Sequence, residues 1–213
     1  MHPGLPSLWQ FHQAADPARI AEDHDGCGAA VRGAPVGILF RSHRIDEIVA
    51  GAREASIATH GGPLALAAAA ATAAAVSASL DEAGSDEIFA LAQHAANRAE
   101  SRRRSSSHTV FAHAMRAIYD DLRRAPRLSA TEVAAKHFPK DPLTIVPLAL
   151  TLAILMDSAQ EAILLAANVG GDSDSVASMA GAILGARYPE TINEEWSRIV
   201  ERVNGHNLDS VGE

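Results

Sequence analysis

Residues 64–80 read LALAAAAATAAAVSASL, an uncharged run made largely of Ala. Ala is the best intrinsic helix former, and its small side chain lets neighbouring helices approach closely. A helix that is apolar on nearly all sides is buried in the interior of a protein. The run is slightly short and too weakly apolar to span a bilayer, so we expect a central core helix and no membrane partner.

The rest of the chain has the same helical character. Apolar residues make up 47% of the sequence but aromatic residues only 4%, whereas a β-sandwich would need more aromatic and β-branched side chains. Apolar residues recur at helical spacing on both sides of the Ala-rich run. We therefore predict one compact all-α domain over residues 1–213, with an irregular segment at 1–25. The expected helices are a short one after the turn at 26–34, one from Ile45 to a stop at 59–63, the central helix at 64–80, and others at about 86–103, 109–124, 130–138, 143–156, 158–169, 174–187 and 190–204.

The charge and the cysteine content exclude several classes of protein. The formal net charge is −8, whereas nucleic-acid binding needs clustered Lys and Arg, so we expect no nucleic-acid partner. Cys27 is the only cysteine and cannot form an internal disulfide. The first residues show no basic segment followed by an apolar stretch, which a signal peptide would have. These features are typical of a cytoplasmic protein.

The sharpest local signal for chemistry is NVGGDSDS at residues 168–175, directly before an apolar helix. Asp172 and Asp174 offer carboxylates and Ser175 a hydroxyl, and Mg²⁺ prefers such oxygen ligands. Gly170 and Gly171 would let the backbone bend tightly around an ion. The same residue types are also ordinary helix caps, and three ligands do not fill a magnesium shell. Spacing alone therefore leaves metal binding and capping open, with capping the more frequent outcome.

Three stretches of the chain occur in a recognisable order. They are GCGAAVRGAPVGIL at 26–39, Thr59-His60 before the Ala-rich helix, and SAQEAILLAANVGGDSDSVASMAGAILGARY at 158–188, which TIVPLAL at 144–150 precedes. Together they resemble segments of the ADP-ribosylglycohydrolase family, which includes dinitrogenase reductase-activating glycohydrolases and ADP-ribosyl-acceptor hydrolases. The resemblance covers about residues 23–205 and implies an all-α, compact multi-helix orthogonal bundle.

The resemblance also implies an activity and a set of site residues. The reaction would be hydrolysis of an N- or O-glycosidic bond to ribose in an ADP-ribose-like or nucleoside-like molecule or an ADP-ribosylated protein. A pair of magnesium ions would orient the ribose hydroxyls and activate water, while a carboxylate assists proton transfer. The implied residues are Asp172, Asp174 and Ser175 as Mg²⁺ ligands, Asp174 as the catalytic carboxylate, and Gly26, Gly28 and His60 as substrate contacts.

The sequence departs from the family pattern near its start. Family chains begin with a Gly-Asp-Ala-Leu-Gly-like helix and a Thr-Asp-Asp-Thr-like element that supplies the other metal ligands, and this sequence has neither. Cys27 replaces the Asn of a Gly-Asn-Gly segment, and Val31 replaces the Met before Arg32. We therefore expect an N-terminally shortened bundle with half of the metal site. It would be an active hydrolase, a non-catalytic binding protein, or one subunit of a split enzyme with a complementing partner. A homo-oligomer is compatible with the first two.

Other residues compete for the same chemistry. Asp23 and Asp25 would approach Asp172 if the glycine turn lines the same cleft, although acidic residues are mostly solvated. The pair Asp120-Asp121 imitates a double-Asp motif, but it follows the Thr-His segment, and a solvated helix face is favoured. Cys27 as a nucleophile would need a lowered pKa, and a packing role is favoured.

Overall fold

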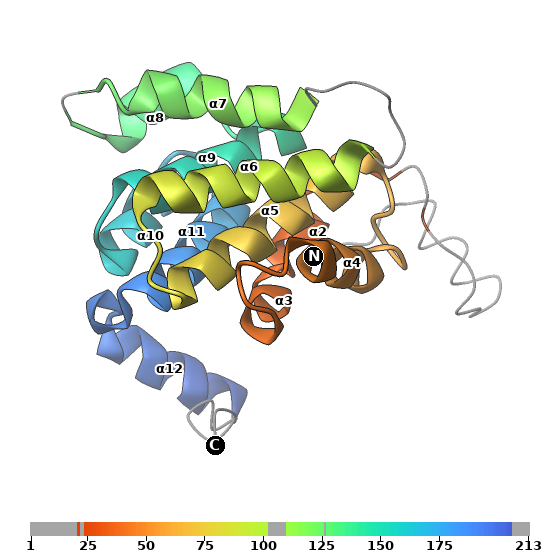
Figure 1. Ribbon diagram of the computed structural model, residues 1–213. Coiled ribbons are helices and arrows are strands. Elements are labelled where there is room, and N and C mark those ends of the chain that lie inside the picture. The colour runs from red at the N-terminus through yellow and green to blue at the C-terminus, as the bar shows by residue number, and fades with distance from the viewer. Residues whose placement is uncertain (1–20, 22–23, 102–109, 126, 206–213) are drawn as a thin grey trace, which may run out of the picture.

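The computed structural model describes residues 21, 24–101, 110–125 and 127–205, which form helices joined by short loops (Figure 1). No strand occurs among these residues, which confirms the predicted all-α class. The helices are α2 (Gly28–Val31), α3 (Ala34–Leu39), α4 (Ile45–Ser56), α5 (Pro63–Leu80), α6 (Ser85–Ser101), α7 (Val110–Leu122), α8 (Ala130–His137), α9 (Pro142–Leu155), α10 (Ala159–Ala167), α11 (Ser173–Arg187), the 3-10 turn η1 (Pro189–Thr191) and α12 (Glu194–Asn204).

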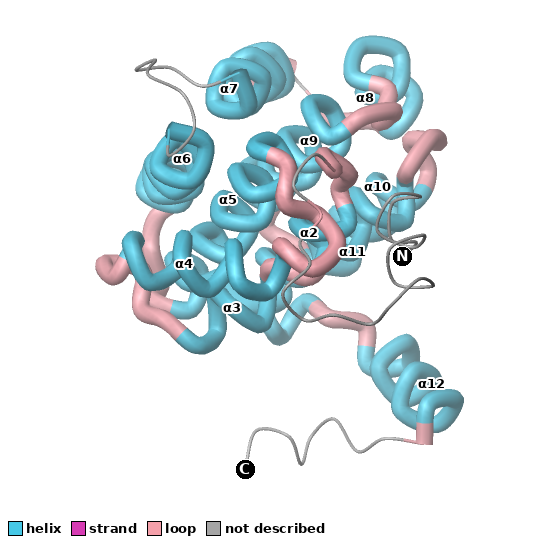
Figure 2. The backbone as a smooth tube through the Cα atoms, turned by 90° about the vertical axis from the view of Figure 1, so that its right-hand side faces the viewer, coloured by secondary structure: helices cyan, strands magenta, loops and turns pink. Residues whose placement is uncertain are grey.

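The Ala-rich helix α5 lies at the centre of the bundle (Figures 1 and 2). Every residue from Ala65 to Ser79 is buried, and the helices packed around α5 include α6, α9, α11 and the short helices before it. By length and apolar composition alone α5 could cross a membrane. Its position inside the bundle instead matches the core helix that the sequence predicted.

Helix α3 approaches α5 backbone to backbone. A Cβ atom at Gly37 would lie 2.4 Å from the carbonyl oxygen of Ala73, and one at Gly33 would lie 3.0 Å from that of Ala69. Real Cβ atoms do not approach so closely without a shift, so the sequence needs glycine at Gly37. This close contact brings α2 and the glycine turn before it against the central helix.

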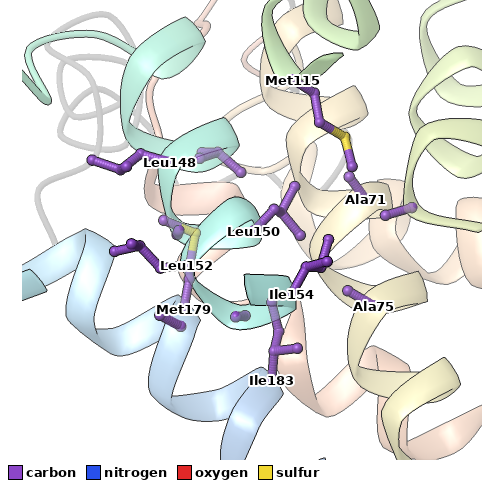
Figure 3. Close-up of a cluster of buried hydrophobic side chains, with 14 of the residues drawn as sticks. Ala71, Ala75, Met115, Leu148, Leu150, Leu152, Ile154, Met179 and Ile183 are labelled. Carbon is purple, nitrogen blue, oxygen red and sulfur yellow. The ribbon is translucent and has the colours of Figure 1, made fainter. Parts of the chain in front are cut away.

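Helix α9 forms the other side of the core. It is apolar all round, and its side chains lie between α5, α7 and α11 (Figure 3). Burial of one such large side chain stabilises the fold by about 1.5–3 kcal/mol. The residues of this layer are Leu148, Leu150, Leu152 and Ile154 of α9, Ala71 and Ala75 of α5, Met115 of α7, and Met179 and Ile183 of α11.

Two predicted boundaries differ from the structure. The last helix was expected from residue 190, but α12 begins at Glu194, because the Asn193 side chain caps it by accepting from the backbone N–H groups of Glu195 and Trp196. The turn expected at 26–34 is already helical from Gly28. The predicted irregular segment lies largely outside the described residues, as does the end of the helix predicted at 86–103.

Candidate active site

The glycine turn at residues 26–28 closes around the imidazole of His60. His60 follows α4, and only 3% of its surface is exposed. A Cβ atom at Gly26 would lie 3.0 Å from His60 Nε2, and one at Gly28 would lie 2.9 Å from His60 Cε1. Any other residue at Gly28 would have to displace the ring. The structure therefore brings together the three residues for which the family resemblance implied substrate contact.

Polar neighbours hold the His60 ring in place. Its Nδ1 atom lies 2.8 Å from Thr59 Oγ1, and its centroid lies 4.4 Å from that of the His24 ring. Arg32 spans the same region, because its Nη2 donates to Thr59 Oγ1 at 2.5 Å and its Nε donates to the Gly28 carbonyl at 3.1 Å. Burial, and then repulsion from His24 and Arg32, lowers the pKa of His60 to about 4. His60 is therefore uncharged at neutral pH.

A second turn places the start of α11 opposite the glycine turn. Gly170 and Gly171 have φ angles of +76° and +60°, in the region that favours glycine. A Cβ atom at Gly171 would lie 2.3 Å from the carbonyl oxygen of Pro139, and that oxygen accepts a hydrogen bond from the Asp172 backbone N–H at 2.9 Å. These contacts fix Asp172 at the N-cap position of α11.

Asp172 occupies the N-cap position, but its side chain does not cap the helix. The contrast is with α9, where the Asp141 side chain accepts from the backbone N–H groups of Leu143 and Thr144. Asp172 Oδ2 instead accepts a hydrogen bond from Cys27 Sγ at 3.0 Å, across 145 residues of sequence. At Asp172 the structure therefore departs from the capping interpretation that the spacing favoured.

Asp174 and Ser175 lie in the first turn of α11, beside Asp172. Hydrogen bonding with the Asp172 side chain, and next with the backbone N–H of Ser175, lowers the pKa of Asp174. The two carboxylates are therefore close enough to interact, and the Asp174 carboxylate also accepts from a backbone N–H group at the start of the helix. Ser175 Oγ lies 3.7 Å from Cys27 Sγ. The glycine turn thus contacts both ends of the Asp172–Ser175 segment through a single thiol.

Cys27 is a neutral hydrogen-bond donor in this arrangement. Burial, and next the hydrogen bond to Asp172, raises the pKa of the Cys27 thiol to about 11. A thiol in this environment stays protonated at neutral pH, whereas a nucleophilic cysteine needs a lowered pKa. The geometry agrees with the packing role that the sequence favoured and adds the donation to Asp172.

Comparison with known families identifies the family of the chain. A family model described as ADP-ribosylglycohydrolase matches residues 3–212, nearly the whole sequence. The chain belongs to the ADP-ribosylglycohydrolase family. The resemblance predicted from the three sequence stretches is confirmed, and the membership indicates hydrolase chemistry on ADP-ribosyl glycosidic bonds. A comparison with curated proteins found no match.

The oxygen donors at the start of α11 are of the kind that Mg²⁺ prefers, but they are too few to fill its coordination shell. Asp172 and Asp174 offer carboxylate oxygens and Ser175 a hydroxyl, whereas Mg²⁺ takes about six oxygens in octahedral geometry. In the described part of the chain, no group of three or more His, Cys, Asp or Glu residues could hold a metal ion. Protein-bound Mg²⁺ often keeps several waters and uses only one or two carboxylates together with substrate oxygens. The residues present fit that mode of binding.

Asp25 was considered as a further metal ligand, but its carboxylate binds the start of α5 instead. Its Oδ1 accepts hydrogen bonds from the backbone N–H groups of Leu64 at 2.9 Å and Ala65 at 3.2 Å. Asp25 therefore caps α5 from outside that helix. The other acidic candidate before the glycine turn, Asp23, lies outside the described residues.

Asp120 and Asp121 lie on α7 and form surface ion pairs. Asp121 Oδ2 lies 2.8 Å from His137 Nε2, and its Oδ1 lies 3.5 Å from Lys136 Nζ. Asp120 lies 3.7 Å from Arg123 on the same helix. This arrangement agrees with the solvated helix face that the sequence favoured over a metal motif.

The residues around His60 were not identified from the sequence. Arg32 was noted only as part of the glycine-rich segment, Thr59 only as part of the Thr-His segment, and His24 only as a possible base for a nucleophilic Cys27. Arg32 meets Thr59 across 27 residues, a pairing that no local spacing encodes.

Proposed function

We propose that this protein is a magnesium-dependent hydrolase that cleaves the glycosidic bond between ADP-ribose, or a related ribosyl group, and an N- or O-linked aglycone. Family membership supports hydrolase chemistry, and one geometric observation carries the assignment of the site. That observation is the hydrogen bond from Cys27 to Asp172, which joins the glycine turn to the acidic start of α11. The bond turns the Asp172 carboxylate away from the helix that it would otherwise cap.

Each residue has a separate role in this proposal. Asp172, Asp174 and Ser175 would hold Mg²⁺, which when bound orients ribose hydroxyls and polarises water. Cys27 fixes the orientation of the Asp172 carboxylate. The lowered pKa of Asp174 keeps that carboxylate ionised at neutral pH, as a ligand of Mg²⁺ must be. In the proposal the same carboxylate also assists proton transfer from the attacking water.

The glycine turn is the proposed contact for the ribosyl ligand. His60 fills the space on one side of Gly26 and Gly28, so neither position can carry a side chain. Backbone without side chains lets a ligand approach the main chain closely. His60 stays uncharged at neutral pH, and it supports the turn by packing against both glycines.

The test is release of ADP-ribose from Arg-linked and Ser-linked ADP-ribosyl substrates, measured together with magnesium binding. The wild type should release ADP-ribose, and removal of Mg²⁺ by a chelator should abolish the release. The double variant Asp172→Ala, Asp174→Ala should lose both properties, whereas Asp121→Ala on α7 is the matched acidic control and should keep them. A double variant that matches the wild type in both assays would show that the site is assigned wrongly.

A second candidate function is binding of an ADP-ribose-like ligand without turnover. The observation that favours it is the donor set, which in the described residues stops at two carboxylates and one hydroxyl at the start of α11. Calorimetry that detects ADP-ribose binding, with no hydrolysis at any magnesium concentration, would support this function over catalysis.

A further inference from the structure

Helix α12 stands away from the other helices, at the lower edge of the molecule in Figures 1 and 2. Its base is attached to α10, because Asn193 Nδ2 donates to Gln160 Oε1 at 3.3 Å. Beyond that point no residue of α12 is buried. Ile199, Val200 and Val203 are 41%, 47% and 75% exposed, which is high for aliphatic side chains.

The apolar residues of α12 form one stripe, made of Trp196, Ile199, Val200 and Val203. They follow the i, i+3, i+4, i+7 spacing of residues that share one helix face. A helix shorter than about 12 residues is marginal in water unless its apolar face is packed, and α12 has 11 residues. The stripe therefore fits a surface that another polypeptide covers.

The two edges of the stripe differ in charge. At about 100° per residue, Glu195 and Arg202 fall on one edge, and Ser197 and Asn204 fall on the other. The charged edge thus carries an acid near the start of the helix and a base near its end. Two such edges are complementary to each other when the helices run in opposite directions.

We propose that a second copy of this chain covers the stripe, with the two α12 helices antiparallel about a twofold axis. In a parallel pair the charged edge of one helix would face the uncharged edge of the other. In an antiparallel pair like edges meet, so Glu195 of each copy faces Arg202 of the other copy. This charge complementarity selects a second copy as the partner, and it is independent of the proposed hydrolase function.

The register of the pair follows from the stripe. Centring the two stripes on each other sets Trp196 against Val203 of the second copy, and Ile199 against Val200. Glu195 of one copy and Arg202 of the second copy are then offset along the helix axis by two residues. At 1.5 Å per residue the offset is about 3 Å, which an arginine side chain spans. A stable interface buries about 1,200–2,000 Å², more than two short helices supply, so the dimer is weak and depends on concentration.

Sedimentation equilibrium of the full chain over a range of concentrations tests this pairing. The wild type should show a monomer–dimer equilibrium, and Val203→Asp should abolish it. Glu195→Arg and Arg202→Glu should each weaken the dimer by about tenfold, because two attractive pairs become repulsive. An equimolar mixture of these two variants should restore wild-type affinity, because the mixed dimer has an acid opposite a base at both ends.

Arg198→Glu is the matched control, since Arg198 pairs with Glu194 on the back of α12 and lies away from the stripe. It makes the same charge change as Arg202→Glu and should leave the dimer unaffected. A chain that stays monomeric at every concentration overturns the proposal, whether residues 1–20 or another protein cover the stripe. A mixture that associates no more tightly than either variant alone overturns the antiparallel pairing.

Discussion

Lowering the pH should destabilise this protein through His60. The ring is buried, and its pKa falls from 6.5 to about 4 on folding. The unfolded chain therefore binds the proton more tightly, and between these two values stability decreases as the pH is lowered. At about 1.4 kcal/mol for each tenfold change in proton affinity, the full loss is about 3 kcal/mol, and about 2 kcal/mol of it is reached at pH 5. Above the unfolded value of 6.5 His60 causes no loss.

Urea unfolding at pH 7.5 and pH 5 measures this contribution when the wild type is compared with His60→Gln. The variant should start less stable, because the contacts of the ring with Thr59 and the glycine turn are removed. Its stability should fall between the two pH values by about 2 kcal/mol less than that of the wild type. His113→Gln, at an exposed position on α7, should keep the wild-type dependence. Equal pH dependence in the wild type and His60→Gln would refute the argument.

Two further predictions concern the contacts that fix Asp172. Cys27→Ala removes the thiol donor and should lower Mg²⁺ affinity in calorimetry by about tenfold or more. Cys27→Ser keeps a donor and should lose less of that affinity. Unchanged affinity in Cys27→Ala would contradict the role of the thiol. Gly171→Ala would place a Cβ atom 2.3 Å from the Pro139 carbonyl at a φ of +60°, and urea unfolding should show a loss above about 2 kcal/mol. Gly205→Ala, with a φ of +64° and open space around it, should lose about 1 kcal/mol or less, and equal losses at the two glycines would argue against a tight turn.

The fold class was predictable because its signal is local. The Ala-rich composition of α5 specifies both a helix and a buried position, and the structure places that helix at the centre. The start of α8, directly after its Ser129 cap, was predicted correctly, whereas the start of α12, directly after its Asn193 cap, was not. Asp25 was not predictable as the cap of α5, since it accepts from backbone N–H groups 39 and 40 residues later.

The sequence singled out the residues of the candidate site, but it did not predict the contacts around them. The sequence singled out Asp172 and left capping and metal binding open, because both use the same residue types at the same spacing. The choice depends on Cys27, which lies 145 residues earlier and draws the carboxylate away from the helix end. Likewise the need for Gly28 became visible only when His60 was seen to fill the space beside it.

The most direct test of the proposed site is a crystal grown with Mn²⁺, which accepts the same oxygen ligands as Mg²⁺ and can be located by anomalous scattering. The proposed site requires an anomalous peak within bonding distance of Asp172, Asp174 and Ser175, on the side that faces the glycine turn. At saturating Mn²⁺, the absence of a peak there, or a peak bound only by other residues, would contradict it.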